Sequence, residues 1–222
     1  KGRLPVLVGG TGFYIQALLY DIDFTETRED TAYRSLLEEK ARTEGNESLY
    51  RMLLEKDPEA AAAIHPNNLK RVIRALEFTR ETGEKISDHN EEQRKRLPAY
   101  DAVFFVLTME REKLYRRIDL RVDQMMEAGL LEEVKRLQEQ GFTSRDVSMQ
   151  GLGYKQILQY LEGEGTLEDA VEQIKLQTRH FAKRQLTWFR RERDVIWVNT
   201  DEFPSREEML DYMENTIRTR FS

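Results

Sequence analysis

The chain has 222 residues, of which 39% are hydrophobic and 9% aromatic, a composition typical of a folded protein and not of a disordered one. It has no cysteine, which excludes disulfides, thiolate metal sites and a cysteine nucleophile, and its three scattered histidines (His65, His89 and His180) disfavour a histidine metal site. Lys and Arg number 35 against 41 Asp and Glu, and the net charge of −6 by itself argues against a nucleic-acid partner.

Three apolar runs predict the strands of a buried sheet: Leu4–Val8, Ala102–Leu107 and Val195–Val198. Each run is continuously apolar, as is typical of parallel strands covered on both faces. The first begins at Leu4, so we expect the sheet to be incomplete in this chain and to continue upstream of Lys1. The fold class predicted from these runs is an α/β core.

Amphipathic periodicity predicts helices between and after these strands. The block between the first two strands contains helical patterns at Asp30–Glu55 and Asn67–Thr82. About 70 residues exceed what a strand crossover needs, so we expect residues 27–98 to form an inserted helical lobe on a core of residues 1–26 and 99–222. Further helices are predicted at Glu110–Gln140, Gln156–Gly163, Leu167–Arg193 and Ser205–Arg220.

A glycine loop, Gly9-Gly10-Thr11-Gly12, joins the first predicted strand to a helix. Backbone amides at a helix N-terminus favour an anion such as phosphate, and a threonine hydroxyl there can donate to a developing oxyanion. The alternative is a tight turn in which glycine supplies a positive φ. Both interpretations remain open from the loop alone.

Two other helix starts carry cations. Lys70, Arg71 and Arg74 can point to one side of the first turns of the second lobe helix, where contact with a polyanion and ordinary solvation remain open. Lys155 follows Gly151-Leu152-Gly153-Tyr154, where a lysine can meet a phosphate, although an ordinary surface lysine is the favoured interpretation.

The segment Lys175–Arg193 is strongly basic, with seven Lys and Arg against one acid. Lys175, Arg179 and Lys183 recur every four residues and are predicted to form one basic stripe, interleaved with aromatic residues. This pattern favours contact with a nucleic-acid phosphate backbone. Binding responds to such a local field, so the overall charge of −6 does not exclude RNA.

Five segments together resemble one known family, the tRNA dimethylallyltransferases, also called tRNA isopentenyltransferases. They are Leu4–Tyr14 (LPVLVGGTGFY), His65–Glu77 (HPNNLKRVIRALE), Arg121–Glu133 (RVDQMMEAGLLEE), Gln150–Gln156 (QGLGYKQ) and Thr178–Trp188 (TRHFAKRQLTW). The resemblance implies a P-loop NTPase-like parallel-sheet core with an inserted helical lobe, and an anticodon stem-loop gripped between the two. It also implies transfer of a dimethylallyl group from dimethylallyl diphosphate to N6 of adenine 37, assisted by Mg²⁺.

The resemblance assigns roles to residues that match the family motifs. Thr11 resembles the threonine at the reacting centre, which contacts both the transferred group and the flipped base. Lys155 resembles the basic residue that faces the diphosphate. Residues that resemble tRNA-contacting positions are Arg34, Lys70, Arg71, Arg74, Arg179, His180, Lys183, Arg184 and Gln185. No residue is assigned to a metal, and Asn68 stands where the family commonly has Asp.

The family's phosphate loop and the aspartate that acts as its general base are missing from this chain. We therefore expect this polypeptide alone to be inactive. Two rival functions remain open: a non-catalytic RNA-binding module, and a small-molecule phosphotransferase on a P-loop-like core. With no run of ~18 apolar residues, we expect no membrane span. The absence of cysteine favours the reducing cytoplasm, and we expect a monomer.

Overall fold

The computed structural model describes residues 4–22 and 31–221, which form two compact units. The first unit is Lys1–Gly12 with Ala102–Ser222, and the second is Phe13–Asp101. The start of the inserted lobe predicted at residue 27 lies outside the described residues. Across the described residues, no helix is both long enough and apolar enough to cross a membrane.

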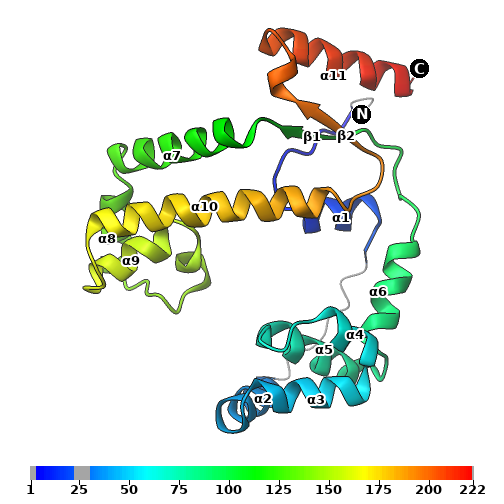
Figure 1. The fold of residues 1–222 in the computed structure, drawn as a ribbon, viewed down its shortest axis with the longest axis vertical. Coiled ribbons are helices and arrows are strands. Elements are labelled where there is room, and N and C mark those ends of the chain that lie inside the picture. The colour runs from blue at the N-terminus through cyan, green and yellow to red at the C-terminus, as the bar shows by residue number, and fades with distance from the viewer. Residues whose placement is uncertain (1–3, 23–30, 222) are drawn as a thin grey trace. The chain divides into compact units, whose positions relative to one another are not determined.

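The first unit contains a two-stranded parallel sheet of β1 (Phe104–Thr108) and β2 (Val195–Asn199). Phe104 lies opposite Val195, and the register continues to Thr108 opposite Asn199. Both strands were predicted, within two residues of their observed limits. Parallel strands need a long crossover connection, which the helices between β1 and β2 supply (Figure 1).

The crossover consists of α7 (Arg111–Glu127), α8 (Leu130–Glu139), α9 (Tyr154–Leu161) and α10 (Leu167–Phe189), with a short 3-10 helix at Val147–Gln150. The single helix predicted at Glu110–Gln140 is two helices, because Gly129 adopts a left-handed φ of 97° between them. Helices α7 to α10 share one buried apolar core, whose members are Val122, Leu130, Val134, Met149, Ile157, Leu158, Ala170 and Ile174.

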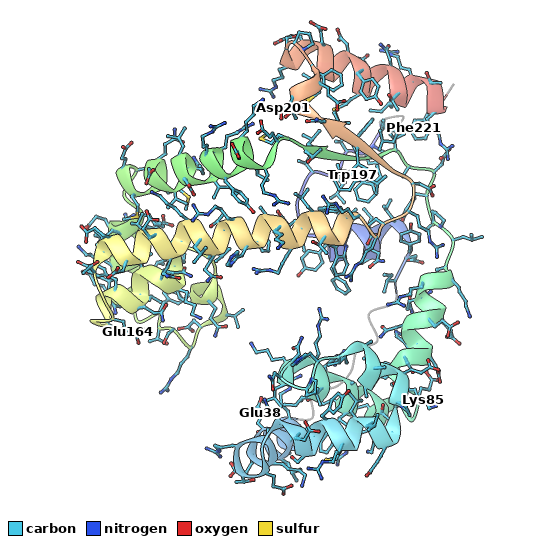
Figure 2. All side chains as sticks on the ribbon, in the orientation of Figure 1. Glu38, Lys85, Glu164, Trp197, Asp201 and Phe221 are labelled. Atoms are coloured by element: carbon cyan, nitrogen blue, oxygen red, sulfur yellow. The ribbon has the colours of Figure 1, made fainter. Side chains whose placement is uncertain are left out.

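The predicted strand at Leu4–Val8 is wrong for the described structure. This segment is not a strand, and its side chains are exposed, Val6 at 78% and Val8 at 89%. A strand needs a neighbour for its backbone hydrogen bonds, and the described sheet pairs only β1 with β2. The predicted coverage on both faces is only partial. Val106 is buried beside the exposed Trp197, labelled in Figure 2, and on the opposite face Val198 is buried beside the exposed Leu107.

After β2, the chain turns through a 3-10 helix at Thr200–Glu202 into α11 (Arg206–Phe221). Asp201, labelled in Figure 2, accepts hydrogen bonds from the Glu110 amide at 2.7 Å and from Lys113 Nζ at 2.8 Å. The carboxylate therefore joins the end of β2 to the start of α7 and favours the helix N-terminus electrostatically.

The second unit is helical. Its helices are α1 (Gly12–Leu19, which begins in the first unit), α2 (Thr31–Glu44), α3 (Asn46–Lys56), α4 (Pro58–Ala63), α5 (Leu69–Thr82) and α6 (Ile86–Lys95). The pattern predicted as one helix at Asp30–Glu55 breaks at Gly45, whose φ is 83°. Helices α2 to α5 lie together in Figure 1. They enclose their own core around Leu37, Leu49, Leu53 and Leu76.

Asp57 organises the centre of this unit and is fully buried. Its Oδ1 accepts the Ala60 amide at 3.0 Å and caps α4, while its Oδ2 accepts the Ser87 amide at 2.9 Å and fixes the start of α6. Helices α4 and α6 were not predicted, because both are short and depend on this tertiary contact.

Candidate functional site

The Gly9–Gly12 loop lies against the C-terminal half of α10. The Gln185 side chain donates from Nε2 to the Gly10 carbonyl oxygen at 2.8 Å. Thr11, predicted to be catalytic, is exposed immediately before α1. The loop therefore presents the Thr11 hydroxyl to solvent beside a fixed helix.

Close approach of α10 side chains explains two of the three glycines of this loop, Gly10 and Gly12. A Cβ atom on Gly10 would lie 2.3 Å from Gln185 Nε2, and one on Gly12 would lie 2.3 Å from the Trp188 ring. None of Gly9, Gly10 and Gly12 has a positive φ. The alternative of a turn that needs left-handed backbone is therefore wrong, and Trp188 is a partner that the sequence did not reveal.

Lys155 is exposed in the first turn of α9, next to a constrained glycine. Gly153 is buried with a φ of 99°, and its amide donates to Gln156 Oε1 at 3.0 Å. The Tyr154 hydroxyl donates to the Glu133 carboxylate on α8, a bond that raises the pKa of Tyr154. The turn before Lys155 is thus held from two sides while the lysine itself reaches solvent.

The predicted basic stripe of α10 requires correction. Arg179 Nη1 lies 2.6 and 2.8 Å from the two oxygens of Asp119, and Lys175 Nζ lies 2.8 Å from Asp123. Both acids are on α7. Two of the three cations are therefore paired inside the protein, and Lys183 alone is exposed without an ion pair among the described residues.

The exposed cationic part of α10 is its C-terminal half. His180, Lys183 and Arg184 are all exposed there, and the Arg184 guanidinium carbon lies 5.8 Å from the centre of the Phe181 ring. Gln185 follows directly and contacts the glycine loop. This half of α10 thus brings exposed cations and the Thr11 loop together in one unit.

The helical unit carries a second group of cations. Lys70, Arg71 and Arg74 are exposed in the first two turns of α5, as the sequence indicated. The helix begins after Asn68, which occupies the cap position without a side-chain cap bond. These cations therefore face solvent at the end of α5 where the helix dipole favours anions.

Arg34 has a partner within the same unit. Its Nε and Nη2 lie 2.9 and 2.7 Å from the two oxygens of Glu77, a side chain only 5% exposed. The bidentate pair joins α2 to α5. Arg34, like Arg179, thus has a structural role that the sequence did not reveal.

The sequence did contain a signal for the ion pairs between α7 and α10. Asp119 and Asp123 are four residues apart, the same spacing as Lys175 and Arg179.

Comparison with known proteins decides the family. The model of the IPP transferase family matches residues 1–192. The chain belongs to the IPP transferase family. It is 58% identical over 213 residues to the tRNA dimethylallyltransferase of Lachnoclostridium phytofermentans, covering 96% of this chain and 68% of the relative. It is 49% identical to that of Acetivibrio thermocellus, covering 99% of this chain and 70% of the relative.

Solved structures of IPP transferases agree with this placement. The full-length tRNA isopentenylpyrophosphate transferase of Bacillus halodurans superposes with a TM-score of 0.65 at 42% identity, over 99% of this chain and 67% of that one. A eukaryotic dimethylallyltransferase described as acting on tRNA gives a TM-score of 0.75 at 30% identity, over 99% of this chain and 58% of that one. All candidate residues lie within the part matched by the IPP transferase model.

Proposed function

We propose that this chain binds tRNA and supports transfer of a dimethylallyl group from dimethylallyl diphosphate to N6 of adenine 37, beside the anticodon. One observation carries the proposal beyond family membership. The exposed Thr11 is held, through Gln185 and Gly10, against the part of α10 that presents Lys183 and Arg184. A potential donor to a reacting oxygen therefore lies on the same unit as cations suited to phosphate.

In the proposed reaction, the N6 nitrogen attacks C1 of the dimethylallyl group while the bond from C1 to the bridging oxygen breaks. The diphosphate leaves with the electron pair, and N6 loses a proton to a general base, a role for which no residue of this chain is proposed. The Thr11 hydroxyl donates to the bridging oxygen as it becomes negative. Lys155 pairs with the diphosphate as a point charge. The adenine must leave its stack to be reached.

The proposed tRNA contacts use the exposed cations of each unit: His180, Lys183 and Arg184 on α10, and Lys70, Arg71 and Arg74 on α5. Cations bind phosphates by releasing counterions, so affinity should fall steeply with salt. Arg34 and Arg179 already hold carboxylates, and Gln185 holds the glycine loop, so we assign these three to positioning the surface.

Three further parts belong to the proposal: Mg²⁺ as a cofactor, which the resemblance implies, a monomeric state and a cytoplasmic location. The described residues contain no group of three His, Cys, Asp or Glu side chains that could hold a metal ion. Diphosphate oxygens are ligands that Mg²⁺ prefers and would hold it, and no step is assigned to it. A P-loop NTPase-like core, also implied by the resemblance, belongs to the same proposal.

Titration of unmodified tRNA at several salt concentrations tests the proposed surface. Replacing Lys183 and Arg184 together by alanine should weaken binding and reduce the slope of log Kd against log salt by about 2. A matched control, Arg136→Ala with Arg206→Ala, removes two exposed cations elsewhere in the same unit and should change the slope far less.

The rival functions predict other results. An RNA-binding module would lose tRNA affinity in the Lys183/Arg184 variant but would not bind dimethylallyl diphosphate. In our proposal, Lys155→Ala weakens binding of that diphosphate while tRNA affinity is retained. For a small-molecule phosphotransferase, none of these substitutions should change the affinity for tRNA. Unchanged tRNA affinity in the Lys183/Arg184 variant would therefore overturn our proposal.

A further inference from the structure

Two acids on α7 face two cations on α10 with the same spacing. Asp119 holds Arg179 at 2.6 Å and Asp123 holds Lys175 at 2.8 Å. Lys175 also lies 3.4 Å from Glu172 on its own helix. From Lys175 to Arg179 the chain advances four residues along α10, while their partners go back four residues along α7, from Asp123 to Asp119. The two ion pairs therefore lie one helical turn apart between antiparallel helices.

One helical turn further along, α7 offers no acid to the next cation of α10. Four residues beyond Arg179 is Lys183, and four residues before Asp119 is Tyr115. Lys183 forms no ion pair anywhere in residues 4–22 or 31–221. The row of pairs therefore ends where the exposed cationic half of α10 begins.

The Arg179–Asp119 pair contributes little to holding the helices together. Side chains of Arg179 and Asp119 remain 24% and 34% exposed, and ion pairs at such positions contribute little to stability. The apolar contacts between the helices come from the core that contains Val122 and Ile174. The larger effect of the acids is therefore on the charge that this surface presents.

We propose that Asp119 and Asp123 are specificity-determining residues that withhold Arg179 and Lys175 from RNA and so confine phosphate contacts to the end of α10. This inference rests on the proposed tRNA binding. A cation already neutralised by a carboxylate releases no counterion on meeting a phosphate. A cation released from its carboxylate would strengthen binding to the phosphates of any RNA. Selective recognition of tRNA depends instead on the shape of the tRNA and on the base that it presents.

The test compares Asp119→Asn with Glu127→Gln. The first variant frees Arg179, which is exposed enough to reach a phosphate, whereas the second removes one charge from an exposed residue of the same helix that has no ion pair among the described side chains. Affinity is measured for tRNA and for an unrelated single-stranded RNA between about 50 and 200 mM salt.

Asp119→Asn should steepen the slope of log Kd against log salt by about 0.7 to 0.9 relative to Glu127→Gln. The unrelated RNA should gain more affinity than tRNA, so the preference for tRNA should fall several-fold. Equal slopes in the two variants would overturn the inference.

A second variant, which leaves neither charge unpaired, decides the question even if Asp119→Asn alone unfolds. Asp119→Asn combined with Arg179→Gln removes the pair as a whole and should leave the wild-type salt slope unchanged, because a paired cation contributes nothing to it. A slope reduced by about 1 would mean that Arg179 contacts RNA, which overturns the inference. If the Lys183/Arg184 variant binds tRNA as tightly as the wild type, the proposed function fails instead, so the two failures are distinguishable.

Discussion

The glycine loop shows how one missing side chain permits a contact between distant parts of a unit. Gly12 approaches the rigid ring of Trp188, whereas Gly10 approaches only the end of the flexible Gln185 side chain. Gly9 has open space around the position of a Cβ atom. The three glycines of the loop therefore differ in how well each tolerates a side chain.

Gly12→Ala should lower the free energy of unfolding by about 1 to 3 kcal/mol, because its Cβ would overlap the Trp188 ring. Gly9→Ala is the matched control and should change it by less than about 0.5 kcal/mol. Urea unfolding measures both. Equal losses in the two variants would show that the loop does not pack on α10 as described.

Asp57 gives the helical unit a defined dependence on pH. Burial acts to raise the pKa of its carboxyl group, but hydrogen bonds from Ala60 and Ser87 outweigh this and hold the pKa below the ordinary value of 3.8. The carboxylate is therefore the favoured form in the folded state. Its stabilising contribution is present above the unfolded pKa and is lost as pH falls through the folded pKa.

Urea unfolding of the wild type and Asp57→Asn should reveal this contribution. The wild type should be more stable by about 1 to 3 kcal/mol near neutral pH, since the amide cannot accept both backbone bonds. The difference should narrow as the pH is lowered below about 4, because only the carboxylate titrates. A difference that stays constant with pH would contradict the assignment.

Between elements, α2 and α5 are joined by charge as well as by apolar packing. Arg34 pairs with Glu77, and the Arg80 guanidinium carbon lies 4.0 Å from the centre of the Tyr33 ring. The two members of the ion pair differ in burial, Arg34 being 40% exposed and Glu77 only 5%. Removing Arg34 and removing the charge of Glu77 should therefore change the free energy of unfolding by different amounts.

Arg34→Ala should destabilise the protein by about 3 kcal/mol, because it leaves a buried carboxylate without its cation. Glu77→Gln should reduce stability by only about 1 kcal/mol, because Arg34 can turn to solvent and the amide still accepts a hydrogen bond. Thermal unfolding ranks the two variants. The reverse order would mean that Arg34 is held mainly by other contacts.

Helix positions were predicted better than helix limits. The periodicity located α5, α9, α10 and α11 to within about two to four residues at each end. It missed the breaks at Gly45 and Gly129, because the apolar pattern continues through both glycines. A left-handed residue turns the next helix toward the same core, so the pattern persists although the axis changes.

At the scale of the whole molecule, each unit has its own core. One is built around Leu37 and Leu76, and the other around Val134 and Ile157. Local opening follows such cooperative units. Arg34→Ala should therefore speed amide hydrogen exchange in α2 to α5 while leaving α7 to α10 at the wild-type rate.

Amide hydrogen exchange of the Arg34→Ala variant, followed by mass spectrometry of its peptides, measures the exchange rate of each helix. Gly12→Ala provides the converse control, since it should speed exchange in α10 and spare α3 and α5. Faster exchange throughout the molecule in both variants would show that the two cores unfold together.

The sequence alone determined the family, the two central strands, the helical character of the insertion, and which segments carry the chemistry. These properties depend on local order, namely apolar periodicity and short motifs. Tertiary structure decided which cations face solvent. Lys175, Arg179 and Lys183 are equivalent in spacing, yet within the described part of the chain only Lys183 lacks an ion pair, because α7 places acids opposite the first two. Likewise, Leu4–Val8 has the composition of a strand, but a strand exists only where another backbone supplies its hydrogen bonds.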